Sequence, residues 1–187
     1  MNKSAILILA ASLAATSLFA AGDDVACPGV PTKDVAAACN DASTSPAMYD
    51  LCMRMLSSSP PTAQVTAYAV AATGAAERSC DSTVVAGKEM LKNGSLAGDL
   101  SDAWRRCLGN YKAARVAIDG VGDQLLRCAF ADLRPGYMDA LAALEDCAAK
   151  LLPAGGTSTP VYGLVVGDRD RAVIAYRLTW PLIPRAS

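Results

Sequence analysis

The chain contains seven cysteines and no histidine, and these two counts restrict the chemistry that it can perform. Without histidine there is no Ser-His or Cys-His nucleophile, and no zinc site of the kind that uses histidine ligands. In an exported chain, cysteines at helix-compatible spacings are more typical of disulfides than of metal thiolates. We therefore expect a disulfide-stabilised binding protein that uses no metal and no cofactor.

Carboxylate pairs are the remaining groups that could do acid–base chemistry, as they do in glycosidases. Two pairs qualify by residue type, Asp99 with Asp102 and Glu145 with Asp146. The first pair fits better in the first turn of a helix, where the helix dipole favours negative charge. The members of the second pair are sequence neighbours, so on a helix they point in different directions. We do not expect the protein to be an enzyme.

Residues 1–22 have the layout of a secretory signal peptide. Lys3 precedes an apolar run over residues 5–19, and small residues at positions 20–22 supply a cleavage region. Removal of this segment leaves residues 23–187 as a single secreted domain.

Charge and surface motifs indicate which partners the mature domain is expected to have. The whole chain has 17 basic and 18 acidic side chains, a balance that favours neither nucleic acid nor a membrane as partner. Asn93 begins an Asn-Gly-Ser tripeptide in an expected turn, which makes it a candidate glycosylation site.

Alanine-rich composition and turn residues predict an all-α fold. We expect an N-terminal helical hairpin at about 32–57, followed by an up-down-up-down four-helix bundle at about 62–182, with disulfides between the helices. Thr32 is a candidate cap for the first short helix, and Ser45 with the proline after it opens the second. The expected long helices span about 62–92, 100–128, 137–153 and 160–180.

The second long segment has the clearest pattern in the chain. Its apolar residues alternate at steps of four and three, the heptad period of a helix in an antiparallel bundle. They are Leu100, Trp104, Cys107, Tyr111, Ala114, Ile118, Val121, Leu125 and Cys128. Gly120 and Gly122 lie within this segment, and a bend at these glycines is an alternative to one straight helix. In the fourth segment, residues 168–171 form a charged interruption of an apolar stretch.

Four cysteines and this tyrosine-containing seam resemble the plant invertase and pectin methylesterase inhibitor family. The residues that carry the resemblance are Cys39, the Tyr-Asp-Leu-Cys sequence ending at Cys52, the Cys-x-x-x-Tyr-x-x-Ala pattern that starts at Cys107, and Cys147 on the third long helix. The resemblance covers residues 33–183. It implies disulfides between Cys39 and Cys52 within the hairpin and between Cys107 and Cys147 within the bundle.

Three cysteines lie outside that pattern, and an odd total leaves at least one thiol free or paired with another chain. Cys27 with Cys128 is the one further bridge that we consider, because the far end of the second long helix should lie near the hairpin. Cys80 falls on the apolar seam of its helix. We expect it to be a buried, inert thiol rather than a reactive one.

The resemblance implies a secreted inhibitor that covers the substrate cleft of a cell-wall carbohydrate-active enzyme in a 1:1 complex, without performing chemistry. A plant pectin methylesterase is favoured over an acid invertase as the partner. Invertase-directed members present a Pro-Lys-Phe tip between the second and third bundle helices, whereas this chain has Pro135-Gly136-Tyr137, with no lysine. The expected location is the apoplast or cell wall, with the vacuole as an alternative.

Family members contact their targets through this tip and through a face of the second to fourth bundle helices. Here the resemblance points to Arg134, Pro135, Gly136 and Tyr137 in the tip, with Asn110, Asp123 and Arg127 near it. Each residue also has a structural interpretation: a simple turn, the start of an apolar stripe, or an exposed ion pair on a helix. A third helix shorter than is usual for the family keeps a second hypothesis open, a non-inhibitory structural bundle on the same scaffold.

Overall fold

The computed structural model describes residues 26–184, which are mostly helical, so the predicted all-α class is confirmed. The expected signal peptide, residues 1–22, lies outside the described residues. Within residues 26–184 the elements are β1 (Thr32–Asp34), α1 (Val35–Ala42), α2 (Pro46–Met55), β2 (Thr62–Gln64), α3 (Val65–Lys92), α4 (Gly98–Leu126), α5 (Leu133–Gly155) and α6 (Pro160–Leu178). No helix in this part of the chain combines the length and apolarity needed to cross a membrane.

The hairpin begins with a short strand that the sequence pattern did not predict. Thr32 does not cap a helix but lies in β1, which pairs antiparallel with β2. Asp34 caps α1 instead, since its Oδ1 accepts hydrogen bonds from two backbone N–H groups of the first turn at 2.8 and 3.2 Å. Pro31 and Pro61 lie just before the paired segments, where proline restricts the backbone and removes a donor, and this favours extended chain over helix.

A pair of cysteines, one from each helix, connects the buried faces of the two short helices α1 and α2. Cys39 and Cys52 lie at disulfide distance, with their Cα atoms 5.6 Å apart, as the resemblance implies. Ser45 caps α2 as predicted, because its Oγ accepts a hydrogen bond from the backbone N–H of Met48 at 3.3 Å. Pro46 occupies the first helical position, where its missing N–H costs nothing.

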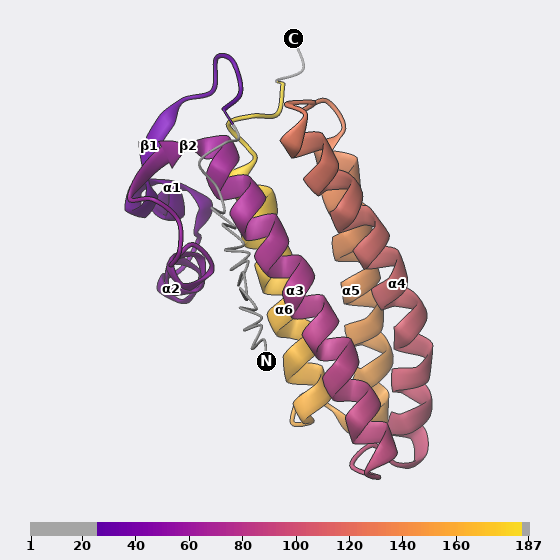
Figure 1. The fold of residues 1–187 in the computed structure, drawn as a ribbon. Coiled ribbons are helices and arrows are strands. Elements are labelled where there is room, and N and C mark those ends of the chain that lie inside the picture. Colours follow the sequence, from indigo (N-terminus) through magenta and orange to yellow (C-terminus); the bar gives the residue numbers. More distant parts are fainter. Residues whose placement is uncertain (1–25, 185–187) are drawn as a thin grey trace, which may run out of the picture.

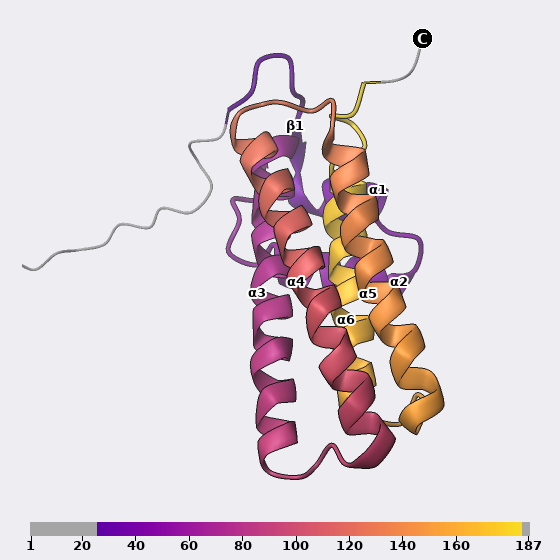
Figure 2. The same ribbon diagram turned by 90° about the vertical axis from the view of Figure 1, so that its right-hand side faces the viewer.

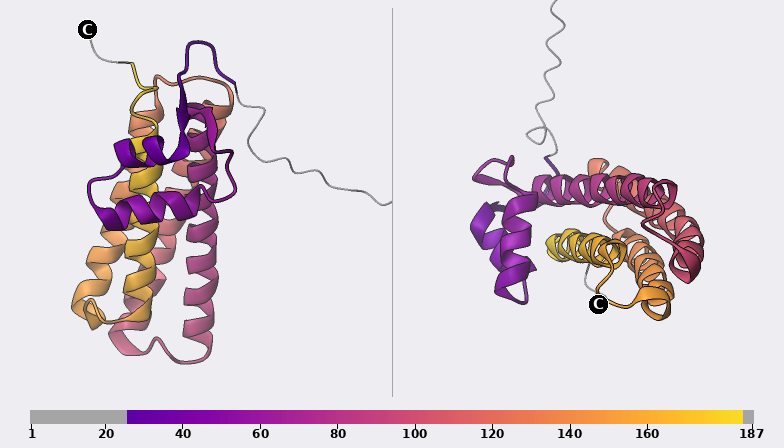
Figure 3. Two further views of the ribbon diagram at one scale, coloured as in Figure 1. Left: turned by 90° about the vertical axis from the view of Figure 1, so that its left-hand side faces the viewer. Right: turned by 90° about the horizontal axis from the view of Figure 1, so that it is seen from below.

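The four long helices lie side by side, and each short connection reverses the direction of the chain (Figures 1 and 2). The hairpin packs beside α3 and α6, on the side of the molecule away from α4 (Figure 3). α4 is one helix that continues through Gly120 and Gly122, so the chain does not break at these glycines. Neither glycine has a neighbouring atom within 4 Å of the position that a Cβ would take.

α5 begins earlier and ends later than the sequence suggested. It starts at Leu133, so Arg134, Pro135 and Gly136 lie in its first turn rather than in a loop. Proline is tolerated there because the first N–H groups of a helix have no partner within the helix. At the other end, the helix continues past Pro153 to Gly155, and Gly156 follows in a left-handed conformation with φ of 69°.

Two further cysteine pairs connect distant parts of the chain. Cys107 on α4 and Cys147 on α5 lie at disulfide distance, with Cα atoms 4.9 Å apart, again as the resemblance implies. Cys27 and Cys128 also lie at disulfide distance, with Cα atoms 5.6 Å apart and a separation of 101 positions in sequence. Cys80 is the free cysteine of the described chain, and it is buried as expected.

The packing of α3 against α4 depends on one glycine. Trp104 is fully buried, and its indole lies directly against Gly87 of α3. A Cβ on residue 87 would overlap the six-membered ring of that indole. The close approach of the two helices therefore requires the absence of a side chain at this position.

We expect Gly87→Ala to lower the free energy of unfolding by about 1–3 kcal/mol, because overpacking forces the indole or the helix to move. Gly120→Ala is the matched control. Its Cβ would meet no atom, and alanine in a helix should raise stability by up to about 1 kcal/mol. Chemical denaturation followed by circular dichroism measures both. A Gly87→Ala variant as stable as the wild type would show that Trp104 does not require this glycine.

Candidate functional site

The connection between α4 and α5, residues 127–132, is held rigidly at one end of the bundle. Cys128 has a φ of 56° and is tied to Cys27. Its backbone N–H donates to the carbonyl of Leu125 at 3.1 Å, and the N–H of Ala129 donates to the carbonyl of Gln124 at 2.9 Å. Local hydrogen bonds and the Cys27–Cys128 pair, which lies at disulfide distance, therefore act together to fix the path of this connection.

Five exposed side chains surround this connection, and we call them the α4–α5 tip: Asp123, Leu126, Arg127, Arg134 and Pro135. Leu126 leaves 55% of its surface in solvent, although it is a large apolar side chain. The tip thus combines an apolar centre with charges of both signs on a fixed backbone. Such a mixture is typical of protein-binding surfaces, where a few apolar anchors are ringed by polar groups.

Two of the predicted contact residues are not part of this surface. Tyr137 is buried in the core, and its Oη lies 2.6 Å from Thr73 Oγ1. Since the Thr73 hydroxyl donates to the carbonyl of Ala69 at 2.7 Å, Tyr137 donates to Thr73, and burial raises the pKa of its phenol. Gly136 faces Val121 of α4 at close range. Both residues therefore serve packing, Tyr137 through its contact with α3 and Gly136 through its close approach to α4.

Asn110 is also distant from the tip. It lies 13 residues before Asp123 on the same helix, which is about 20 Å along the helix axis. Its Nδ2 donates to the carbonyl of Ala143 at 3.0 Å and to Asp146 at 2.6 Å, and Lys150 donates to its Oδ1 at 2.9 Å. Hydrogen bonds from Lys150 and then from Asn110 lower the pKa of Asp146. This network joins α4 to α5 beside the Cys107–Cys147 pair.

The middle of α6 contains a buried carboxylate, Asp168. The sequence pattern did not identify this residue as part of the core. Asp168 is 1% exposed and accepts hydrogen bonds from Tyr111 Oη at 2.7 Å and from Ser79 Oγ at 2.5 Å. These three residues, the Asp168 cluster, come from α6, α4 and α3. Residues 168–171, the charged interruption of the apolar fourth segment, lie within α6 as part of one continuous helix.

Burial and the carboxylate of Asp168 both raise the pKa values of two neighbouring side chains. Burial first, and then Asp168, raise the pKa of the Tyr111 phenol. The same two causes raise the pKa of the Cys80 thiol to about 12. The sequence spacing could have predicted that Asp168 is buried. Asp168 lies on the apolar face of α6, because Val161, Val165, Asp168 and Ala172 follow one another at steps of four, three and four.

A second surface feature, the groove between α3 and α4, contains its own ionic cluster. Arg115 pairs with Glu77 at 2.9 Å, with Asp81, and with Asp119 at 3.7 Å. Burial is the main cause that raises the pKa of Glu77. The guanidinium of Arg115 is thus shared among three carboxylates and links the two helices along this groove.

Asn93 lies at the end of the bundle opposite the tip, where α3 connects to α4 (Figure 1). It is exposed, and its Oδ1 accepts a hydrogen bond from the backbone N–H of Ser95 at 3.0 Å. Its glycosylation stays a prediction, and a glycan at this position would project away from the tip.

We expect Asp168→Ala to lower the free energy of unfolding by about 2–4 kcal/mol, because it leaves the hydroxyls of Tyr111 and Ser79 buried without an acceptor. Asp170→Ala is the control two residues along, since Asp170 pairs only with its neighbour Arg169 and both side chains are partly exposed, so this change should alter stability by less than about 0.5 kcal/mol. Urea titration distinguishes them. Equal stability of the two variants would exclude a structural role for the Asp168 cluster.

Cys80 should resist alkylation by iodoacetamide at about pH 8 in the folded protein and react once the protein is denatured. The folded thiol has a pKa of about 12 against 9.0 for the ordinary group, so almost none of it is thiolate at that pH. Because the folded pKa is the higher one, its contribution to stability is lost as the pH rises from 9.0 towards 12. Mass spectrometry of the alkylated protein gives the result, and rapid labelling of folded protein would contradict it.

The comparisons with known proteins add no relative to these observations. No protein-family model, no curated protein and no solved structure matches the chain. The residues and contacts described above are therefore the basis on which a function is proposed.

Proposed function

We propose that this protein is a secreted inhibitor of a plant pectin methylesterase, which it blocks by covering the substrate cleft with the α4–α5 tip. The observation that carries the proposal is the cysteine framework. Cys39 and Cys52, and Cys107 and Cys147, lie at disulfide distance in the pairing that the inhibitor-family resemblance implies. The hairpin beside a group of four long helices supports the same scaffold.

The tip supports inhibition by occupancy because its backbone is already fixed before binding. A partner that binds a rigid surface loses less conformational entropy than one that must order a loop. Arg134 and Pro135 lie in the first turn of α5, Asp123 lies in the last turn of α4, and Arg127 follows that helix as its C-cap. Leu126 supplies the apolar centre between them, and no residue of the inhibitor takes part in a reaction.

Because Tyr137 and Gly136 pack against other helices, fewer residues of α5 are proposed as target contacts than the resemblance implied. Tyr137 is buried and a Cβ on residue 136 would meet Val121, so Arg134 and Pro135 are the exposed side chains that α5 contributes to the tip. The lack of a lysine at this place is the reason for favouring pectin methylesterase over acid invertase as the target. The complex is proposed to be 1:1 and to form in the cell wall.

A non-inhibitory structural bundle is the second hypothesis. It is supported by the same burial of Tyr137, since an aromatic residue that serves the core cannot serve a target. The two hypotheses predict different behaviour toward an enzyme, although they predict the same stability and the same disulfides.

The test is a paired inhibition assay. The oxidised mature protein is titrated against a plant pectin methylesterase and, separately, against a plant acid invertase. We expect stoichiometric loss of pectin methylesterase activity alone. Arg134→Glu, which reverses a tip charge, should weaken inhibition by about tenfold or more. Arg105→Glu is the matched control, because Arg105 is equally exposed but lies near the other end of α4.

Three results would overturn parts of this proposal. Loss of invertase activity alone would change the target, and equal effects of Arg134→Glu and Arg105→Glu would move the contact surface away from the tip. Loss of neither activity, from a folded protein with native circular dichroism, would favour the structural bundle.

A further inference from the structure

The C-terminal end of α6 presents an arginine that is oriented by two contacts but paired with no acid. Arg177 Nε donates a hydrogen bond to the carbonyl of Ala42 at 2.5 Å. Its Cζ lies 4.4 Å from the centre of the Trp180 ring, a cation–π distance. Among residues 26–184, no carboxylate forms a salt bridge with Arg177. Its remaining guanidinium N–H groups therefore have no partner in the described protein.

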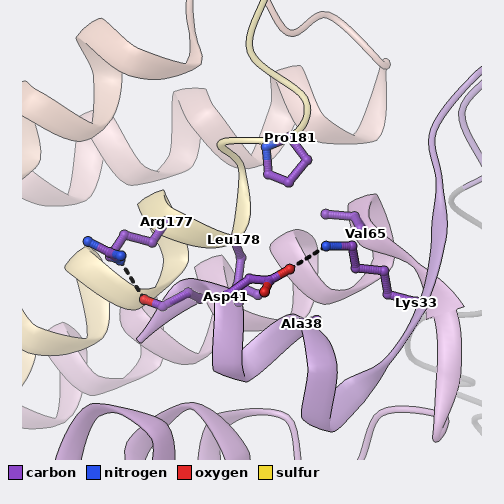
Figure 4. Close-up of a pocket in the computed structure, with 8 residues that line it drawn as sticks. Lys33, Ala38, Asp41, Val65, Arg177, Leu178 and Pro181 are labelled. Atoms are coloured by element: carbon purple, nitrogen blue, oxygen red, sulfur yellow. Dashed lines mark hydrogen bonds and ion pairs between the residues drawn. The ribbon is translucent and has the colours of Figure 1, made fainter. Parts of the chain in front are cut away.

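The neighbouring charges do not supply that partner. Lys33 and Asp41 lie close by on the hairpin and pair with each other, as Figure 4 shows. Because these two charges pair with each other, neither of them neutralises the guanidinium of Arg177. Other arginines without a salt bridge, such as Arg105 and Arg134, are exposed and have no hydrogen bond that orients them. Arg177 differs because backbone and indole hold its plane in place.

Trp180 is fixed beside this arginine and remains half exposed, with 50% of its surface in solvent. It follows Thr179, which is buried and donates its hydroxyl to the carbonyl of Tyr176 at 2.6 Å. The rings of Tyr176 and Trp180 lie 6.0 Å apart in an edge-on arrangement. An exposed tryptophan with this much support is a flat, rigid and apolar surface at the end of α6.

The cavity next to Arg177 is too small to receive an anchoring side chain. It is bounded by Lys33, Val65, Arg177 and Pro181 and holds about 20 Å³, the space of roughly one water molecule (Figure 4). A ligand at this end must therefore lie flat on the surface rather than insert into it. This excludes the usual protein hot spot, in which a side chain of the partner fills a pocket.

We propose that Arg177 and Trp180 form a binding site for a uronic acid residue of an acidic polysaccharide. The carboxylate of the sugar accepts two parallel hydrogen bonds from the free edge of the guanidinium, the geometry in which arginine binds carboxylates best. The apolar C–H face of the pyranose ring packs on the exposed indole and removes it from water. Stacking of Arg177 on Trp180 leaves its in-plane donors available, so both contacts form together.

This site is independent of the proposed inhibition. It lies at the C-terminal end of α6 and just beyond it, beside the hairpin, and uses none of the tip residues. Its role would be to hold the protein on an anionic polymer, whatever enzyme it meets there. One surface contact of this size predicts weak binding, with a dissociation constant on the order of 1 mM, and weaker binding as salt increases.

The experiment titrates the full oxidised protein with an unesterified oligogalacturonide at low salt. Two tryptophans are present, and Trp104 is fully buried, so a change in tryptophan fluorescence reports on Trp180. Calorimetry gives the affinity of the variants. The fully methyl-esterified oligomer and a neutral malto-oligosaccharide of the same length are the matched ligands. We expect binding of the charged oligomer and loss of binding when the carboxylates are esterified.

Variants then assign the binding to the two side chains. Trp180→Ala and Arg177→Gln should each weaken binding by about tenfold or more, whereas Trp180→Phe retains an aromatic surface and should retain most of it. Arg177→Lys keeps the charge without the fork and should fall between Arg177→Gln and the wild type. Arg105→Gln is the control for loss of one positive charge. Thermal melts check that each variant is folded.

Several outcomes would overturn the proposal. They are no binding of the oligogalacturonide at millimolar concentration, equal binding of the esterified or neutral oligomers, and unchanged binding by folded Trp180→Ala protein. Binding of oligoglutamate as tightly as oligogalacturonide, with the same fluorescence change, would replace the sugar by an acidic peptide. Arg134→Glu serves as the cross-check, since it should reduce inhibition and leave oligogalacturonide binding unchanged.

Discussion

Asp168 lies in the middle of α6 with 1% of its surface exposed, and a carboxylate in that position is tolerated only where its oxygens are hydrogen-bonded. Tyr111 and Ser79 meet this requirement from α4 and α3. Apolar contacts alone would allow helices with small alanine side chains to slide past one another. Because the two hydroxyls must reach the two carboxylate oxygens, the relative heights of three helices are set by polar contacts as well as by packing.

With the interior determined in this way, the surface features that could bind partners lie at the connections and ends of the helices. The tip depends on the tether from Cys27 to Cys128, and the Arg177–Trp180 pair depends on the contact of α6 with α1. Both surfaces are thus rigid for reasons that lie outside the surfaces themselves. The N-terminal segment contributes to each, since it supplies Cys27 to one and the Ala42 carbonyl to the other.

Local patterns in the sequence predicted the structural features that depend on interactions between residues close in sequence. The heptad seam from Leu100 to Cys128 corresponds to α4, and the cap at Ser45 lies where expected, because both depend on residues within a few turns. The β1–β2 pairing was not predictable in this way, since it joins segments 30 residues apart. Pro135 and Gly136 looked like helix breakers, but contact with α4 allows a helix to begin before them. The site residues could not be predicted from local patterns for the same reason. Arg134 is exposed and Tyr137 is buried because α5 begins at Leu133, before both of them.

The distribution of the cysteines has a consequence for the response of the protein to proteolysis. A cut in the connection between α1 and α2, between α3 and α4, or within residues 129–132 leaves the two pieces joined through a cysteine pair. A cut within residues 156–159 does not, because no cysteine follows Cys147. α6 would then be held only by non-covalent contacts. A single protease cleavage at that connection therefore allows α6, the helix that contains Asp168, to dissociate. The whole bundle would then lose its structure.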